Sequence, residues 1–496
     1  MKMKLIFLGI VTLMFMGGCT KDLVPKDYSD INPSIFPQSE DDIQAMVNSC
    51  YYPLRGAWWD GINSTSERGI MFMLDATTEI LSGKFSIQRD GHLLNLLPTN
   101  EEMTYFYDGM SDSPGSGFYN KISRMTTTLD AIEKSTVSDA VKKKAIAEVR
   151  CARGLLAYDL FDIYGPIVIA PLEVLQNPLK EKPLARLSHD EMVKFIEDDL
   201  VAAAADLPDP GATEYGKFSK ALAKMIHIRL MLHEKKWDKV NALCDDIIKM
   251  NYFHIQSDYV GMWGLNGARN SKEVIWAVPC DYDGTSENQW QLMVLPSNFD
   301  PKGGWATVQS TWYFYDSFEP TDIRKSMLIT EYTGTDGITY NRANPGTNID
   351  LGPIPLKMDQ DALRTTGLTT VDIIQYRYAD VLLSKAEALA NMSAPTQEAI
   401  DLVNVIRRRA QIPEIKLADY SSLSAFNDMI LTERSHEYWC ENGQYRADLI
   451  RHGKFISRCK ELTGSTYADD NKVVFPFSLR AVSEGKGVFI QNPGYN

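Results

Sequence analysis

The stretch YADVLLSKAEALANMSAPTQEAIDLVNVIRRRA, residues 378–410, indicates the fold more directly than any other part of the chain. In its first half, apolar residues recur at the spacing of one helix face: Ala379, Leu382, Leu383, Ala386 and Leu389. A polar joint, NMSAPT, separates this run from a second amphipathic run. Small residues such as Ala386 and Ala390 would let the two helices approach closely. A helix pair of about 33 residues has the length of a tetratricopeptide unit.

Two further stretches repeat the pattern. Residues 219–250 contain two amphipathic runs with the short joint EKKW between them. Residues 118–169 predict two long helices broken near STVSD, and the second should stop at Tyr164-Gly165-Pro166 because glycine and proline disfavour continuation. The repeat consensus is loose, so the sequence predicts helix pairs more firmly than it predicts a named repeat.

The first helix of the body should begin at a capping box. Ser39 is followed three residues later by Asp42, and the helix is expected to run to about Trp58. Residues 39–254 and 371–460 are therefore predicted to form a mainly α, tetratricopeptide-like helix-pair scaffold.

A loop-rich, partly β segment, residues 255–370, interrupts the predicted scaffold. Here SKEVIWAVP alternates like a strand, and Gly, Asn, Asp and Pro are frequent elsewhere. Long irregular insertions are uncommon in compact domains and usually carry function. The length of 496 residues would allow two to four domains. We expect residues 39–496 to form one domain, with 255–370 as its variable ligand-binding part.

Composition limits the classes of ligand. The formal net charge of −14 argues against nucleic acid, which needs concentrated positive charge. It also favours neutral ligands over strongly anionic ones, although a local basic pocket could override the average.

The N-terminus has the pattern of an export signal. Lys2 and Lys4 precede an apolar run that is too short to span a bilayer, and Gly-Gly then leads into Cys19. Residues 1–19 therefore predict a lipoprotein signal peptide with Cys19 as the lipidated first residue. The polar, proline-containing residues 20–38 predict an extended tether, so the body would be attached to a membrane only through its lipid.

No motif in the sequence predicts catalysis or a cofactor. Walker, G-x-S-x-G, H-E-x-x-H and dinucleotide-binding patterns are absent, and the seven histidines do not pair at the spacing of metal ligands. The six cysteines after Cys19 form no CxxC pair, and we expect them to pack as small apolar residues. One disulfide between two of them is the alternative, because the protein is expected to be exported. The six cysteines are Cys50, Cys151, Cys244, Cys280, Cys440 and Cys459.

Aromatic residues in the predicted loops give the clearest signal of binding. The stretch DYDGTSENQWQ combines Tyr282, Asn288 and Trp290, while Trp305 follows two glycines in DPKGGWATVQ. Trp in such loops is costly to expose unless it packs or binds something. Sugar rings can stack on indole, and amide groups can bind hydroxyls. These four residues, with Trp59 as a fifth candidate, are the predicted ligand contacts.

Four ordered segments resemble one known family, the SusD/RagB family of outer-membrane lipoproteins from Bacteroidetes, over nearly the whole chain. The segments are EVRCARGLLAYDLFDIYGPIVI (148–169), YRYADVLLSKAEALA…AIDLVNVIRRRAQI (376–412), LTERSHEYWCENGQYRADLIRHGKF (431–455) and VFPFSLRAVSEGKGVFIQNPGYN (474–496). The family usually has Arg-Tyr where this chain has Tyr445-Arg446, and its acidic residue and Asn-Pro are replaced around 481–485. These departures indicate a divergent branch.

The resemblance implies a function but no particular contact residues, because the family's ligand contacts lie in variable loops. It implies a lipid-anchored protein at the outer-membrane surface that binds glycans and caps a SusC-type TonB-dependent transporter, to which it delivers oligosaccharide. A peptide-binding member of the same architecture is the main alternative. A secreted glycosidase, which would need two facing carboxylates in a cleft, is a third.

Overall fold

The computed structural model describes residues 37–58, 60–177, 179, 182–281, 285–358, 368–420 and 422–495. The predicted signal peptide, Cys19 and nearly all of the predicted tether lie outside the described residues. The body is mainly helical, as the periodicity predicts.

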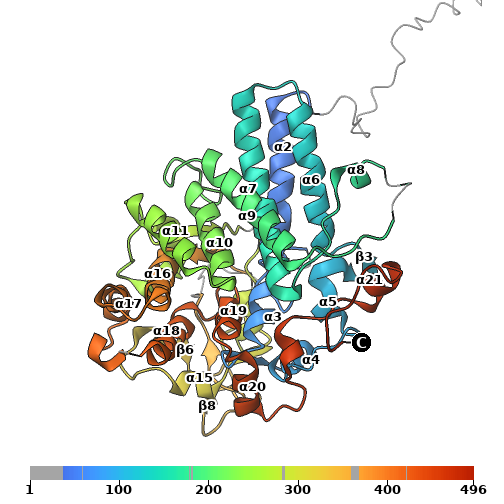
Figure 1. Ribbon diagram of the computed structural model, residues 1–496. Coiled ribbons are helices and arrows are strands. Elements are labelled where there is room, and N and C mark those ends of the chain that lie inside the picture. Colours follow the sequence, from blue (N-terminus) through green and yellow to red (C-terminus); the bar gives the residue numbers. More distant parts are fainter. Residues whose placement is uncertain are drawn as a thin grey trace, which may run out of the picture.

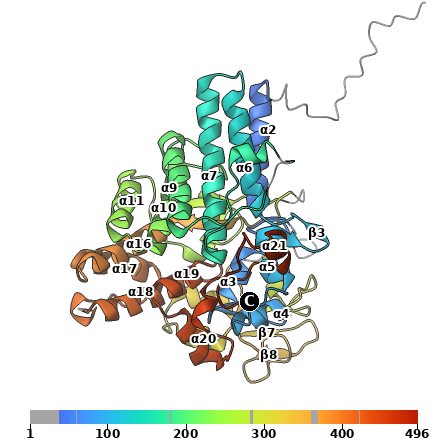
Figure 2. The same ribbon diagram turned by 45° about the vertical axis from the view of Figure 1, so that its right-hand side comes forward.

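Nine helices form a curved array in which α17 and α18 both pack on α16, and we call it the helical arc (Figure 1, Figure 2). It consists of α2 (Glu40–Tyr51), α6 (Tyr119–Lys134), α7 (Asp139–Tyr164), α9 (His189–Asp206), α10 (Lys220–His233), α11 (Trp237–Lys249), α16 (Tyr378–Met392), α17 (Gln397–Arg409) and α18 (Leu423–Tyr438).

The predicted helix pairs are confirmed, with joints at the expected places. Ser39 and Asp42 form the predicted capping box, and Gly165 ends α7 with a φ of 72°. The first helix stops at Tyr51 rather than at Trp58. Pro53 lies in a short 3₁₀ turn, η1 (Tyr52–Leu54), because proline cannot continue an α-helix interior.

The arc is continuous across the irregular segment. Helix α11 precedes that segment and α16 follows it, yet the two pack against each other, and α16 then packs on α17. Ala379, Ala386 and Ala390 of α16 are fully buried at these contacts. Small side chains on this helix therefore allow the close approach that the sequence predicts.

Besides the arc, the described residues form short helices and five two-stranded antiparallel sheets, and most of the short helices labelled in Figure 1 lie in its lower part, whereas α8 lies beside α6. The short helices are α3 (Ile70–Asp75), α4 (Ser86–His92), α5 (Glu101–Asp108), α8 (Leu172–Leu175), α12 (Tyr259–Met262), α13 (Gly267–Asn270), α14 (Trp290–Val294), α15 (Trp312–Asp316), α19 (Gln444–Arg451), α20 (Phe455–Thr463) and α21 (Leu479–Glu484). The strand pairs are β1 (Leu81–Gly83) with β5 (Val308–Ser310), β2 (Gly109–Met110) with β3 (Ser113–Pro114), β4 (Val274–Val278) with β10 (Ile373–Arg377), β6 (Leu328–Ile329) with β9 (Ile354–Pro355), and β7 (Glu331–Thr333) with β8 (Thr339–Asn341).

Residues 52–118 pack with the irregular segment rather than extending the row of helices. Strand β1 pairs with β5 in the register Leu81 to Ser310, and Thr65 donates a hydrogen bond to Asn288. We call residues 52–118 and 255–370 together the loop-rich half. The predicted strand in SKEVIWAVP is confirmed as β4. One large apolar core contains residues of both the arc and the loop-rich half.

Fully buried charges lie where the arc meets the loop-rich half. Arg377, the last residue of β10, contacts Glu273 at 2.8 Å, Glu441 at 2.7 Å, and also Glu437 of α18. Arg324 and Arg409 bind the same Glu437. Burial would raise the pKa of Glu437, but Arg409, Arg377 and Arg324 together hold that pKa well below its usual range. Glu437 is therefore ionised and fully paired inside the protein.

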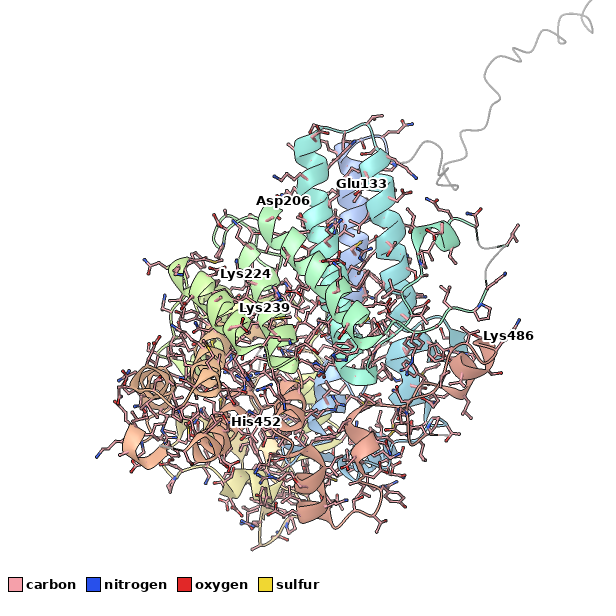
Figure 3. The ribbon with its side chains drawn as sticks, viewed as in Figure 1. Glu133, Asp206, Lys224, Lys239, His452 and Lys486 are labelled. Atoms are coloured by element: carbon pink, nitrogen blue, oxygen red, sulfur yellow. The ribbon has the colours of Figure 1, made fainter. Side chains whose placement is uncertain are left out.

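The ion pairs on the outside of the arc are of a different kind. Lys224 of α10 pairs with Asp246 at 2.6 Å, and Lys239 of α11 pairs with Glu197 at 2.7 Å. Figure 3 labels both lysines on the outer helices. Solvent screens such pairs, and each typically contributes about 0–1 kcal/mol.

Removing the buried guanidinium should therefore cost far more than removing an exposed one. We expect Arg377→Met to lower the free energy of unfolding by about 3–5 kcal/mol, because three carboxylates lose a buried partner. Arg408→Met is the matched control, since Arg408 pairs with Glu414 at the surface and its side chain is 57% exposed; its effect should stay below about 1 kcal/mol. Denaturant unfolding of both variants measures the difference. Equal effects would contradict the structural role of Arg377.

A pH dependence follows from Asp75, at the end of α3. Its Oδ2 accepts the backbone N–H of Cys440 at 2.8 Å, and burial raises its pKa from 3.8 to about 7. Between these values the folded state binds more protons than the unfolded state, so stability falls as pH rises. We expect the free energy of unfolding of Asp75→Asn, relative to the parent, to increase from about pH 4 to about pH 7 and then level off. A difference that does not change with pH would contradict this assignment.

Candidate functional site

Trp305 and Trp58 form an aromatic pair at the surface of the loop-rich half. Their ring centroids lie 5.3 Å apart and the rings are tilted by 55°. Trp305 is 50% exposed, while Trp58 is half-buried. An indole that stays half exposed beside another ring is an apolar surface available to a ligand.

Helix α14 holds the segment of Trp305 in place. The backbone N–H of Trp305 donates to Leu292 O at 2.7 Å, and the next two residues donate to Leu295 O and Met293 O. The residue before Trp305 is Gly304, and no side chain fits at this position, because a Cβ would lie 2.3 Å from Leu295 O. The two glycines before Trp305 therefore allow tight backbone packing at this point of the chain.

Backbone hydrogen bonds also fix the segment that contains Trp58. Glu287 N donates to Gly56 O at 2.5 Å, and Ile62 N donates to Pro53 O at 2.9 Å. The indole N–H of Trp58 donates to Glu67 at 3.4 Å. The turn after α2 and the irregular segment thus meet at this pair, although more than 200 residues separate them in the chain.

A polar hairpin packs against the loop that leads to Trp305. Asn298 O accepts the N–H of Thr335 at 2.7 Å, and the Asn298 side chain bonds Tyr332 and Asp336. Tyr340 on β8 donates to the same Asp336 at 2.8 Å. This network gives the neighbourhood of Trp305 amide, carboxylate and phenol groups of the kind that bind hydroxyls.

The structure places two of the predicted contact residues in the core. Trp290 is 0% exposed and stacks on Phe72 with centroids 5.1 Å apart. Asn288 is also 0% exposed; it donates to Val371 O at 2.7 Å and accepts hydrogen bonds from Thr65 and from the Trp290 backbone. The prediction that Trp290 and Asn288 touch the ligand is therefore wrong in this structure. Their stretch forms the start of α14, and its apolar side faces the core.

Of the three remaining candidates, the structure describes one. Trp305 is exposed as the sequence analysis expects, whereas Tyr282 and Trp59 lie outside the described residues. Sequence analysis did not choose Trp58 as a contact. The adjacent residues Trp58 and Trp59 indicated an aromatic site, but the sequence could not show that Trp58 lies beside Trp305.

The described part of the chain holds no group of three or more His, Cys, Asp or Glu residues placed to bind a metal ion. The six cysteines after Cys19 are buried free thiols, and burial raises the pKa of Cys50 to about 11. Such thiols are poor nucleophiles. Within the described residues, no helix is long and apolar enough to cross a membrane.

Comparison with known proteins gives a consistent result. The model of the SusD family matches residues 324–495. The SusD-like protein P38 of Formosa agariphila is 34% identical, with 96% of this chain and 95% of that protein covered. Among solved structures, a SusD superfamily protein from Parabacteroides distasonis superposes with a TM-score of 0.76 at 22% identity, covering 92% of this chain and 100% of that one. Surface glycan-binding protein A from Bacteroides thetaiotaomicron, in complex with laminarihexaose, gives a TM-score of 0.70 at 17% identity over 91% and 99% of the two chains.

The two tryptophans, Trp290 and Trp305, should respond differently to truncation. We expect Trp290→Ala to lower the free energy of unfolding by about 3–5 kcal/mol, because it leaves a cavity against Phe72. Trp305→Ala should cost less than about 1.5 kcal/mol, since half of that side chain is already in water. Urea unfolding of the two variants under one set of conditions measures both. A Trp290→Ala protein as stable as Trp305→Ala would contradict the core assignment.

Proposed function

The chain belongs to the SusD family, and we propose that it binds glycans at the cell surface, with the Trp58–Trp305 pair as its stacking platform. The observation that carries the proposal is the half-exposed indole of Trp305, held against Trp58 by the backbone of α14. Trp59, next to Trp58, and Tyr282 remain proposed contacts.

The physical basis is a preformed apolar face surrounded by polar groups. A sugar ring presents C–H groups on one side, which pack on indole, and hydroxyls at its edge. Because the anchoring hydrogen bonds already order the Trp305 backbone, little conformational entropy is lost when a ligand binds. The Asn298–Asp336 network on the neighbouring hairpin is the proposed source of hydroxyl contacts.

The proposed ligand is a neutral oligosaccharide or polysaccharide. The net charge of −14 disfavours polyanions at most of the surface. A structural neighbour is a surface glycan-binding protein in complex with laminarihexaose, and another is a laminarin-binding SusD-like protein. These neighbours make laminarin-type glucans the first probe to use.

The cellular role is proposed from the family resemblance and the N-terminal pattern. The protein would be exported, lipidated at Cys19 and anchored at the outer-membrane surface, with residues 20–38 as tether. It would pass bound glycan to a SusC-like TonB-dependent transporter, and its role would be binding rather than catalysis, without a cofactor.

Substitution of the platform tests the function. We expect Trp305→Ala to weaken glycan binding by about 2 kcal/mol, roughly thirtyfold in Kd, which is typical of an aromatic anchor, and Trp58→Ala to weaken it as well. The measurement is a binding screen of the chain lacking residues 1–19 against neutral polysaccharides, with short peptides included, followed by calorimetry on the best ligand.

Trp312→Ala is the matched control for these variants. The guanidinium of Arg342 lies 4.5 Å from the ring centroid of Trp312 and covers that ring. Its loss should leave glycan binding within about twofold of the parent. Unchanged binding in both Trp305→Ala and Trp58→Ala would exclude the platform, and binding to peptides alone would favour the peptide-binding alternative.

A further inference from the structure

A hollow separate from the aromatic pair lies beside helices of the arc, and we call it the basic hollow. It has a volume of about 260 Å³ and is formed by the loop between α9 and α10, by Tyr252 and Phe253 after α11, and by residues 268–277 of α13 and β4. Neither Trp58 nor Trp305 lines it. The volume lies just below the roughly 300–1,000 Å³ of sites for drug-sized ligands, so only a small group can enter.

Positive charge gathers at this hollow. Lys217, Arg269 and Lys272 line it, against one acidic side chain in the lining, Glu214. Arg269 is bound to Asp372 through contacts of 2.7 and 3.0 Å, so its charge is balanced. The two lysines are not balanced in this way.

Both lysines have neutral partners. Lys272 Nζ donates to Tyr252 Oη at 2.7 Å, and Lys217 Nζ donates to Asn48 Oδ1 at 2.9 Å. Within the residues that the structure describes, neither lysine forms an ion pair. Lys217 Nζ also lies 4.4 Å from the ring centroid of Tyr51, and neither Tyr51 nor Asn48 lines the hollow, so Lys272 is the lysine whose ammonium is available there. An ammonium has three donors, so Lys272 retains N–H groups for an anion. Although the chain has a net charge of −14, the local excess of positive charge at this hollow favours an anionic ligand.

Aromatic rings lie under the cations. Lys272 is 4.1 Å from the ring centroid of Tyr252, and Arg269 is 5.2 Å from that of Tyr215, a residue that is 41% exposed. Buried Phe253 and Trp276 form an apolar base. Asn270, Ser271 and Thr213 add polar groups to the wall.

We propose that the basic hollow binds the carboxylate-bearing ring of an acidic sugar, a hexuronate unit of a glycan chain. Lys272 would bind the carboxylate, the polar wall would bind hydroxyls, and Tyr215 and Tyr252 would lie beside the ring. A compact hollow fits one ring better than an extended peptide, which needs a long groove. This inference rests on the proposed glycan-binding function but assigns a separate site with a different ligand chemistry.

The test uses uronate oligosaccharides and their neutral counterparts. Oligomers of galacturonate, glucuronate and mannuronate are titrated into the chain lacking residues 1–19, alongside the same oligomers after reduction of their carboxyl groups. The inference predicts that at least one acidic oligomer binds and that its reduced form binds at least about tenfold more weakly, because a charge-assisted hydrogen bond is lost. Raising the salt concentration should weaken the binding.

Variants of Lys272 locate the site. Lys272→Met and Lys272→Glu should each weaken uronate binding by about tenfold or more, with the larger loss in Lys272→Glu. Lys460→Glu is the matched control, because Lys460 is exposed on α20, without an ion pair among the described residues and far from α11 in Figure 1. It should leave binding unchanged, as should Trp305→Ala.

The outcomes separate this inference from the proposed function. Uronate binding that is lost in Lys272→Glu and kept in Trp305→Ala supports the inference, whatever happens to neutral glycans. Absence of binding to every acidic oligomer overturns it, as does equal binding of the reduced oligomers. It is also overturned if Lys460→Glu has the same effect as Lys272→Glu, if Trp305→Ala alone abolishes uronate binding, or if a glutamate-rich peptide binds the hollow and uronates do not. Loss of neutral-glycan binding in Trp305→Ala reports only on the Trp58–Trp305 pair.

Discussion

The guanidinium of Arg377 joins the two halves of the molecule, because β10 ends at this residue and α16 begins at the next. It contacts Glu273 beside β4, Glu437 of α18 and Glu441 after that helix. Buried ion pairs add little net stability compared with apolar packing, but an unpaired buried charge is very costly. Few arrangements of the two halves would pair every one of these buried charges, so the network specifies how the arc meets the loop-rich half. A second buried network, in which Arg434 binds Asp380 and Asp448, extends this constraint to α16 and α19.

Contacts lead from this junction to the aromatic pair. The N–H of Cys440, between Glu437 and Glu441, bonds Asp75 at the end of α3. On the same helix Phe72 stacks on Trp290 of α14, and α14 accepts the hydrogen bonds that place Trp305. Trp290 therefore supports, from inside the protein, the surface that carries Trp305. Trp290, which the sequence analysis predicts as a contact, is thus a positioning residue for Trp305, the proposed contact.

Helix pairs could be predicted because their signal is local. The apolar spacing of Ala379, Leu382 and Leu383 depends only on neighbours along the chain. Trp290 and Asn288 are buried because they contact Phe72, Thr65 and Val371, which are distant in sequence. Composition alone therefore could not separate a buried tryptophan from an exposed one. Likewise, Arg377 and Glu437 belong to segments that identified the family, yet a single sequence gives no sign that these charges are buried and meet each other.

The charge argument drawn from composition applies to the average surface and not to each site. At physiological ionic strength, charges more than about 8 Å apart are largely screened, so a ligand senses nearby groups rather than the total of −14. At the aromatic pair the described polar groups include the carboxylate of Glu67, which accepts the indole N–H of Trp58, and the neighbouring hairpin adds amides, phenols and the carboxylate of Asp336, which suit neutral hydroxyls. In the basic hollow Lys217, Arg269 and Lys272 stand against the single acidic side chain Glu214 in the lining, and this local positive charge would outweigh a remote acidic surface. One chain can therefore offer an aromatic stacking surface and, as proposed, an anion-binding hollow, and a glycan that contains both neutral and acidic units would use both.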